Sequence, residues 1–322
     1  MNNLERATLT TIAYHNSLSL ALSSTEIYKF LANITPTQFC LGEIRLALKD
    51  LTAKKTINES NGFFCLKNEK TLINQRLKNQ KVTIKKWEKL NKLAWIIASL
   101  PYIKTSFVTG SIASDNARNN SDLDILVITN KNRFWTARAI LTIVFTVLGQ
   151  RRHDTYIKDR LCHSALVTDG QLINRDSFSF AQDIIKAIPF NISSPNSMKL
   201  FYDNSWLNKY LSNYRQLNAI THNQHTYKPA RILIIIKRFF ESFLNNSLGD
   251  VLEKWSMDYQ VNRIKKGILP NERLTINQRC LVATPFSYDL EKLNLFKKTI
   301  KKILGEQDLD GVDKLWMTAL DA

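Results

Sequence analysis

The alternation of apolar and polar residues over the first seventy positions predicts three helices followed by a hairpin. Apolar residues at helical spacing place the helices at about 4–15, 24–31 and 41–51. Ser23 and Glu26 form a capping box at the start of the second helix. Asn61 and Gly62 lie between two apolar runs and predict a tight hairpin turn. This order of elements is that of a winged helix-turn-helix, so we expect a winged-helix-like domain over residues 1–72.

A long basic stretch from 71 to 99 predicts a single helix. Leu90, Leu93 and Trp95 belong to an apolar stripe, and seven lysines and arginines lie at other positions. Such charges predict a solvated face. Pro101 ends the helix. We therefore expect a linker helix, at 73–103, that packs on the domains before and after it.

The pattern beyond Pro101 predicts a small mixed sheet and then mostly helices. The near-continuous apolar run at 125–128 is typical of a strand in a sheet covered on both faces. A helix at 132–148 and a strand at 161–167 follow. Further helices are predicted at 177–188, 196–212, 229–255 and 288–304. The fold class is therefore α+β (mixed α/β), with a core at 104–190 and a helical C-terminal region at 191–322.

Two apolar segments are better explained by a protein core than by a membrane. The run from Phe134 to Leu148 contains Arg138 and is shorter than the roughly 20 residues that a bilayer span needs. Ile232, Ile236 and Phe239 lie on one side of a later helix and are expected in the core. We therefore expect no membrane partner.

The charge and the cysteines narrow the location and the partners. The net charge of +17 favours polyanions such as nucleic acid or nucleotides, although solvated basic faces in a lysine-rich chain would also explain it. The four cysteines are scattered, with no CxxC pair. Scattered cysteines and an N-terminus without an apolar signal core predict a cytoplasmic protein with reduced thiols.

The chemistry of the chain is concentrated in a Gly-Ser turn followed by two aspartates. Gly110 and Ser111 precede an Asp-x-Asp pair, Asp122 and Asp124, on an apolar strand. Residues i and i+2 of a strand point to one face, so the two carboxylates project together and invite a divalent cation between them. Glycine lets a phosphate approach the backbone, and the serine adds a hydroxyl and an N–H group. The pattern predicts a metal and nucleotide site.

The segment VTGSIASDNARNNSDLDILVI resembles the signature of the DNA polymerase beta-like nucleotidyltransferase superfamily. The resemblance implies a metal-dependent transfer of a nucleoside monophosphate from an NTP to a hydroxyl acceptor. It implies that Asp122 and Asp124 are catalytic and bind Mg²⁺ (or Mn²⁺), and that Gly110 and Ser111 bind the substrate. The acceptor remains open: a nucleic acid or another polyanion, a protein side chain or a small molecule.

One part of the superfamily pattern is missing. A third carboxylate usually comes from a later strand, but the strand at 161–167 contains no Asp or Glu. Asp154 and Asp159 precede it, and His163 lies within it as another candidate base or ligand. The alternative function is a catalytically degenerate protein that senses nucleotide or binds DNA or a partner.

Several arginines are candidates for contacts with triphosphate or polyanion oxygens. They are Arg118, Arg133, Arg138, Arg151 and Arg152. Each could equally have a surface or helix-capping role.

Overall fold

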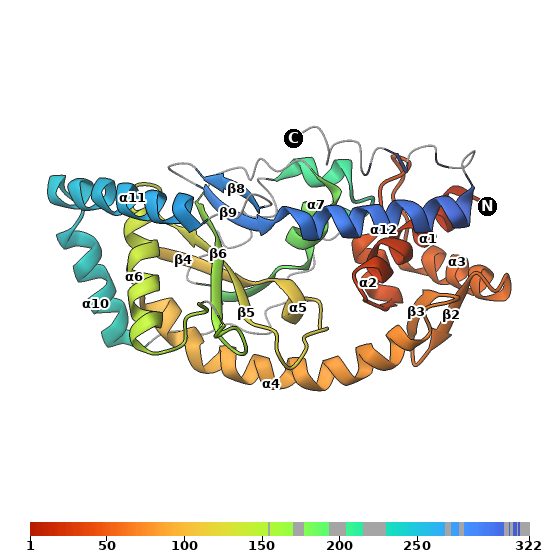
Figure 1. Ribbon diagram of the computed structural model, residues 1–322, viewed down its shortest axis with the longest axis horizontal. Coiled ribbons are helices and arrows are strands. Elements are labelled where there is room, and N and C mark those ends of the chain that lie inside the picture. Colours follow the sequence, from red (N-terminus) through yellow and green to blue (C-terminus); the bar gives the residue numbers. More distant parts are fainter. Residues whose placement is uncertain are drawn as a thin grey trace.

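The computed structural model describes most of the chain in eight segments and two single residues. These are 1–153, 155–169, 177–192, 204–214, 230–267, 272–276, 280–305, 309, 312–313 and 315. The molecule is elongated, with a mixed sheet towards one end and the N-terminal helices at the other (Figure 1). The mixed α+β class predicted from the sequence is confirmed.

The N-terminal elements follow the predicted order. They are α1 (Asn3–Ser17), β1 (Leu22–Ser23), α2 (Ser24–Phe30), α3 (Leu41–Ala53), β2 (Ile57–Ser60) and β3 (Phe63–Leu66), and the strands form a sheet in the order β1-β3-β2. The Ser23–Glu26 capping box is present at the start of α2. At the hairpin turn Asn61 and Gly62 both have positive φ, 53° and 76°, as a tight two-residue turn requires.

The second sheet has six strands. In chain order these are β4 (Ile103–Val108), β5 (Leu123–Thr129), β6 (Leu161–Thr168), β7 (Ile188–Ile192), β8 (Glu272–Ile276) and β9 (Cys280–Pro285), and their spatial order is β7-β4-β5-β6-β9-β8. Only β5 and β6 pair in parallel; all other pairs are antiparallel.

Helices cover both faces of this sheet, as the apolar run in β5 predicted. They are α4 (Thr71–Ser99), α5 (Gly110–Ala113), α6 (Phe134–Val147), α7 (Phe178–Lys186), α10 (Arg231–Phe243), α11 (Ser247–Gly267) and α12 (Phe286–Leu304), with a short 3-10 helix, η2 (Ser205–Lys209). Leu123, Ile125 and Val127 of β5 pack in one core with α4 and α6. Leu126 and Ile128 point to the other face, into a second core.

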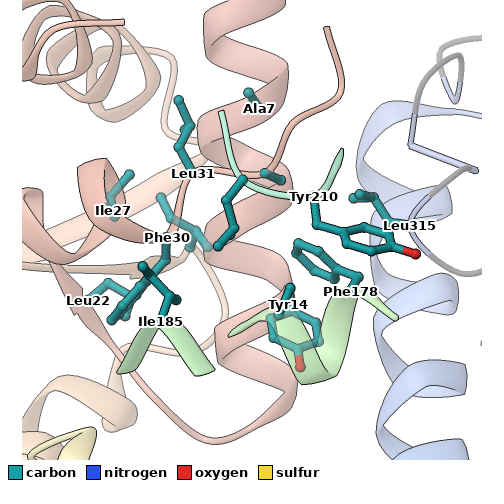
Figure 2. Close-up of a cluster of buried hydrophobic side chains, with 14 of the residues drawn as sticks. Ala7, Tyr14, Leu22, Ile27, Phe30, Leu31, Phe178, Ile185, Tyr210 and Leu315 are labelled. Atoms are coloured by element: carbon teal, nitrogen blue, oxygen red, sulfur yellow. The ribbon is translucent and has the colours of Figure 1, made fainter. Parts of the chain in front are cut away.

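The second core joins the N-terminal helices to the sheet. It combines Tyr14 and Phe30 from α1 and α2 with Phe178 from α7 and Tyr210, which follows η2 (Figure 2). Helix α12 also enters this core through Phe296 and packs along α1 (Figure 1). The first and the last parts of the chain therefore share one hydrophobic interior.

The C-terminal region differs from the expectation of helices alone. Strands β8 and β9 were not predicted, and the helix expected at 229–255 is two helices, α10 and α11. The break is tight, because a Cβ on Gly249 would lie 1.8 Å from the carbonyl oxygen of Leu244. The helix expected at 196–212 falls partly outside the described residues, and its described part contains η2.

The expectation that the apolar side of α10 is core was wrong for the described chain. Ile232, Ile236 and Phe239 are 61%, 45% and 65% exposed. Helix α10 instead contacts the rest of the fold through polar groups: Lys237 Nζ donates to the carbonyl oxygens of Ala98 and Ile103. Helix α6 is also only partly buried, since Val147 is 80% exposed. Among the described residues, no helix is both long and apolar enough to cross a membrane.

Candidate metal and nucleotide site

Asp122 and Asp124 lie at the start of β5, where the sheet meets the Gly-Ser turn. The backbone N–H of Thr109, just before that turn, donates to the carbonyl oxygen of Asp124 at 3.0 Å. This bond ties the two halves of the motif together. Leu123 between the two aspartates is fully buried in the core on the other face, so the alternation of the strand directs both carboxylates to one side, as predicted.

A third side chain with a metal-ligating atom comes from the neighbouring strand. Cys162 of β6 is the register partner of Asp124 across the parallel pair. Ligand atoms of Asp122, Asp124 and Cys162 all lie within 4.8 Å of one another. In the described part of the chain these three form the only group of this kind among His, Cys, Asp and Glu. Cys162 was not predicted from the sequence, because a carboxylate or a histidine was expected from this strand.

The electrostatics of the cluster favour a cation. Burial, together with the neighbouring charge of Asp122, raises the pKa of Asp124 to about 7. Arg152 supplies a compensating charge: its guanidinium donates to Asp122 Oδ2 at 2.6 Å and to Cys162 Sγ at 3.6 Å. Two carboxylates and a sulfur with this spacing have the donor chemistry of a divalent metal site.

Gly110 is required by the close approach of Asp124. Its φ is +65°, and a Cβ at this position would lie 2.4 Å from Asp124 Oδ2. Any other residue would therefore combine backbone strain with a clash at the metal site. Ser111 follows in the first turn of α5 and is partly exposed next to the exposed Gly110. The structure thus places the four predicted site residues around one surface.

Helix α4 fixes the loop that connects the turn to the aspartates. Arg76 donates to the carbonyl oxygen of Ser114, and Lys86 Nζ donates to that of Ser121 at 2.7 Å. Between them, Asn79, Gln80 and Thr83 bond to the loop residues Asn116, Asp115 and Ala117. Arg76 and Lys86 are 2% exposed, so the expectation that the charges of this helix lie on a solvated face was wrong for these two.

None of the other candidates for the third ligand that the structure describes reaches the site. Asp159 pairs with Lys86 and Lys89; although burial raises its pKa, these two hydrogen bonds outweigh burial and lower it. His163 points to the opposite face of β6, where its Nε2 lies 2.9 Å from Thr142 Oγ1. Burial and Arg138 lower the pKa of His163 to about 3. Asp154 lies outside the described residues.

Among the candidate arginines, Arg152 contacts the site through Asp122 and Cys162. Arg133 is buried and holds the turn between α10 and α11 through Leu244 and Asp250. Arg138 donates to Gln260 of α11. Arg118 is exposed in the loop.

Comparison with known proteins agrees with this geometry. Residues 74–190 match the nucleotidyltransferase domain family. The match begins inside α4, the helix that holds the motif loop, and ends in β7, the edge strand beside β4. No curated protein and no solved structure matches the chain. Residues 74–190 therefore form a nucleotidyltransferase domain, and their Gly-Ser turn and Asp-x-Asp strand are consistent with the DNA polymerase beta-like superfamily.

Proposed function

We propose that this protein is a metal-dependent nucleotidyltransferase that moves a nucleoside monophosphate from an NTP to a hydroxyl and releases pyrophosphate. The observation that carries the proposal is the convergence of Asp122 and Asp124 beside the Gly110 turn, within the segment that matches the family. Asp122 and Asp124 hold Mg²⁺ or Mn²⁺, and Gly110 and Ser111 bind the triphosphate.

The roles follow from the chemistry of in-line displacement at phosphorus. A bound divalent cation would supply charge stabilisation to the attacking and leaving oxygens. The protein supplies position: Gly110 leaves the backbone open to a phosphate, and Ser111 offers a hydroxyl and an N–H group. Arg152, 44% exposed at its side chain beside Asp122, is placed to turn from the carboxylate to a phosphate oxygen.

We propose a polyanionic acceptor, such as a nucleic acid, on the strength of the +17 net charge. The exposed face of α3 does not by itself favour a nucleic acid, because its charges are mixed: Glu43, Arg45, Lys49 and Asp50. A cytoplasmic location with no membrane partner is consistent with the scattered cysteines and belongs to the same proposal. The winged-helix-like unit over residues 1–72 would then bind nucleic acid or a protein partner.

Incorporation of labelled NTP in the presence of Mg²⁺ or Mn²⁺ tests the activity. We expect Asp122→Ala to abolish incorporation. Asp258→Ala removes an exposed carboxylate of α11 far from the site in sequence and should leave it intact. Nucleotide binding without turnover by the unaltered protein would instead support the alternative, a degenerate nucleotide sensor.

The salt dependence of DNA binding tests the acceptor separately. Release of counterions makes the affinity fall steeply with salt when several phosphates are contacted. A flat response would count against a nucleic-acid acceptor and leave a protein or a small molecule.

A further inference from the structure

The third position of the metal site is occupied by a sulfur. The superfamily that the motif resembles usually places a carboxylate on the strand next to the Asp-x-Asp strand. Here that strand is β6, and the residue in register with Asp124 is Cys162. The two strands enter the site in parallel from Leu123 and Leu161, which pair with each other and are both buried. This buried pair fixes which side chains of each strand reach the carboxylate face.

The thiol of Cys162 lies on the same side of the sheet as the two carboxylates. Cys162 is half-buried, next to Asp122 and Asp124, whereas the neighbouring His163 points into the opposite side of the sheet. A cation placed between the three groups needs only small side-chain movements to reach about 2.0–2.2 Å from oxygen and about 2.3 Å from sulfur.

A positive group already occupies this corner. Arg152 bonds both Asp122 Oδ2 and Cys162 Sγ. The two atoms that accept hydrogen bonds from the guanidinium are also atoms that would bind a metal ion. The position of Arg152 thus shows that Asp122 and Cys162 can together bind a positively charged group.

We propose that Cys162 is the third protein ligand of the metal, so that the site binds thiophilic divalent cations such as Zn²⁺ or Co²⁺ in preference to Mg²⁺. The inference rests on the proposed function for the role of the site, but not for the identity of its ligands. Mg²⁺ takes oxygen ligands, whereas thiolate strongly favours zinc and its neighbours in the first transition row. Replacing one carboxylate by a thiolate therefore shifts the metal preference of the whole site.

Cobalt titration of the reduced, metal-free full chain tests the ligand directly. Co²⁺ bound to a thiolate gives a sulfur-to-metal charge-transfer absorption in the near ultraviolet, which oxygen ligands alone do not give. We expect this band in the unaltered protein and its loss in Cys162→Ser. Cys40→Ser is the matched control, because Cys40 is exposed at the start of α3, where a serine also caps a helix.

Competition between metals gives the second readout. We expect the preference for Zn²⁺ over Mg²⁺ to fall by more than about tenfold in Cys162→Ser and in Cys162→Asp, since both replace sulfur by oxygen. Cys162→Asp restores a carboxylate and should bind Mg²⁺ more tightly than the unaltered protein. Circular dichroism confirms that each variant is folded.

The outcomes separate this inference from the proposed function. Nucleotide incorporation with Mg²⁺ but no charge-transfer band would overturn the role of Cys162 and leave the transferase. A band that depends on Cys162, with no incorporation under any metal, would support the ligand and reject the transferase. Absence of divalent binding in every variant would overturn the inference as well.

Discussion

Gly110 and Asp124 constrain each other at the centre of the site. The carboxylate of Asp124 lies where a Cβ of residue 110 would be, and the backbone there is left-handed. The absence of a side chain at position 110 is therefore required first by Asp124, independently of any bound phosphate. A side chain at position 110 would displace the most buried carboxylate of the cluster.

Gly110→Ala should cost both stability and metal binding. The left-handed backbone alone costs a non-glycine residue roughly 1–2 kcal/mol, and the clash moves Asp124 in addition. Gly62→Ala is the matched control, because Gly62 has φ +76° but nothing within 4 Å of its Cβ position. Urea unfolding and metal titration should show that both variants lose stability and that only Gly110→Ala loses metal affinity. Equal metal affinity in the two variants would contradict this role of Gly110.

Arg152→Gln should strengthen the binding of divalent metal and weaken the binding of NTP. Removal of a positive charge beside Asp122 and Cys162 should tighten divalent metal binding by roughly threefold to tenfold. The same change should raise the KM for NTP, because a phosphate loses a partner. Lys158→Gln removes one charge from an exposed position of the nearby loop and controls for net charge. Parallel changes in metal and NTP affinity would argue against Arg152 as a group that exchanges between them.

The residues of the site were predictable to different degrees. Gly110, Ser111, Asp122 and Asp124 are local in the chain, so their spacing was enough to bring them together. Cys162 comes from another strand, and its place depends on the register of β5 with β6 and on an irregularity just beyond Asp124. Alternation along β6 from the buried Leu161 places Cys162 on the carboxylate face. This step requires knowing that Leu161 pairs with Leu123.

At the scale of elements, α4 holds the loop between the Gly-Ser turn and the two aspartates in place. Its inward polar side chains bond one loop residue after another between Ser114 and Ser121. Lys86 also reaches Asp159 at 2.8 Å, at the turn before β6. One lysine thus connects the loop before β5 with the turn before β6, the two segments that deliver Asp122 and Cys162.

Lys86→Met should destabilise the protein much more than Lys89→Met. Lys86 has a side chain only 2% exposed, and its loss leaves the carbonyl oxygen of Ser121 without this donor, at a cost of about 2–3 kcal/mol. Lys89 pairs with the same Asp159, but its side chain is 50% exposed, so its loss should cost less than about 1 kcal/mol. Urea denaturation of the two variants measures the difference. Equal losses would mean that the Asp159 contact, common to both, dominates.

The elements themselves show what local pattern can and cannot predict. The bounds of α4 were predicted because one apolar stripe runs along the segment and Pro101 stops it. Strands β8 and β9 were missed because their residues lie among basic helical stretches, and only on folding does β9 pair with β6 and β8 with β9. The exposed side of α10 has the periodicity of a core helix, and periodicity carries no information about what covers it.

At the scale of the whole molecule, one core joins the N-terminal helices to the six-stranded sheet. His15 of α1 lies fully buried in the middle of this junction, stacked on Phe30 of α2 at 5.2 Å between ring centres. Its Nδ1 donates to the carbonyl oxygen of Thr11 at 2.9 Å, and Lys186 of α7 lies over the ring of Phe30. A charge on His15 would therefore destabilise the packing between the N-terminal helices and the part of the chain that contains the sheet.

The pH dependence of stability should report this junction. Burial, with the positive charge of Lys186, lowers the pKa of His15 well below its ordinary value of 6.5, so the folded protein keeps the ring neutral while the unfolded chain takes up a proton. The contribution of the neutral His15 ring to the free energy of unfolding is therefore fully present above pH 6.5 and is lost as the pH falls below it. One such residue costs about 1.4 kcal/mol between pH 7.5 and pH 5.5.

His15→Phe should remove that share of the pH dependence while keeping the stacking with Phe30. His163, whose pKa is lowered to about 3, contributes an equal share over the same range and remains in the variant. Because only the His15 share is removed, we expect the unfolding free energy of this variant, measured in urea, to lose about 1.4 kcal/mol less between pH 7.5 and pH 5.5 than that of the unaltered protein. His153→Phe alters an exposed histidine and should leave the loss unchanged. Because the N-terminal helices and the sheet share one core, this change should appear in a single transition; a separate, pH-sensitive transition of the N-terminal helices would show that the core does not couple the two parts.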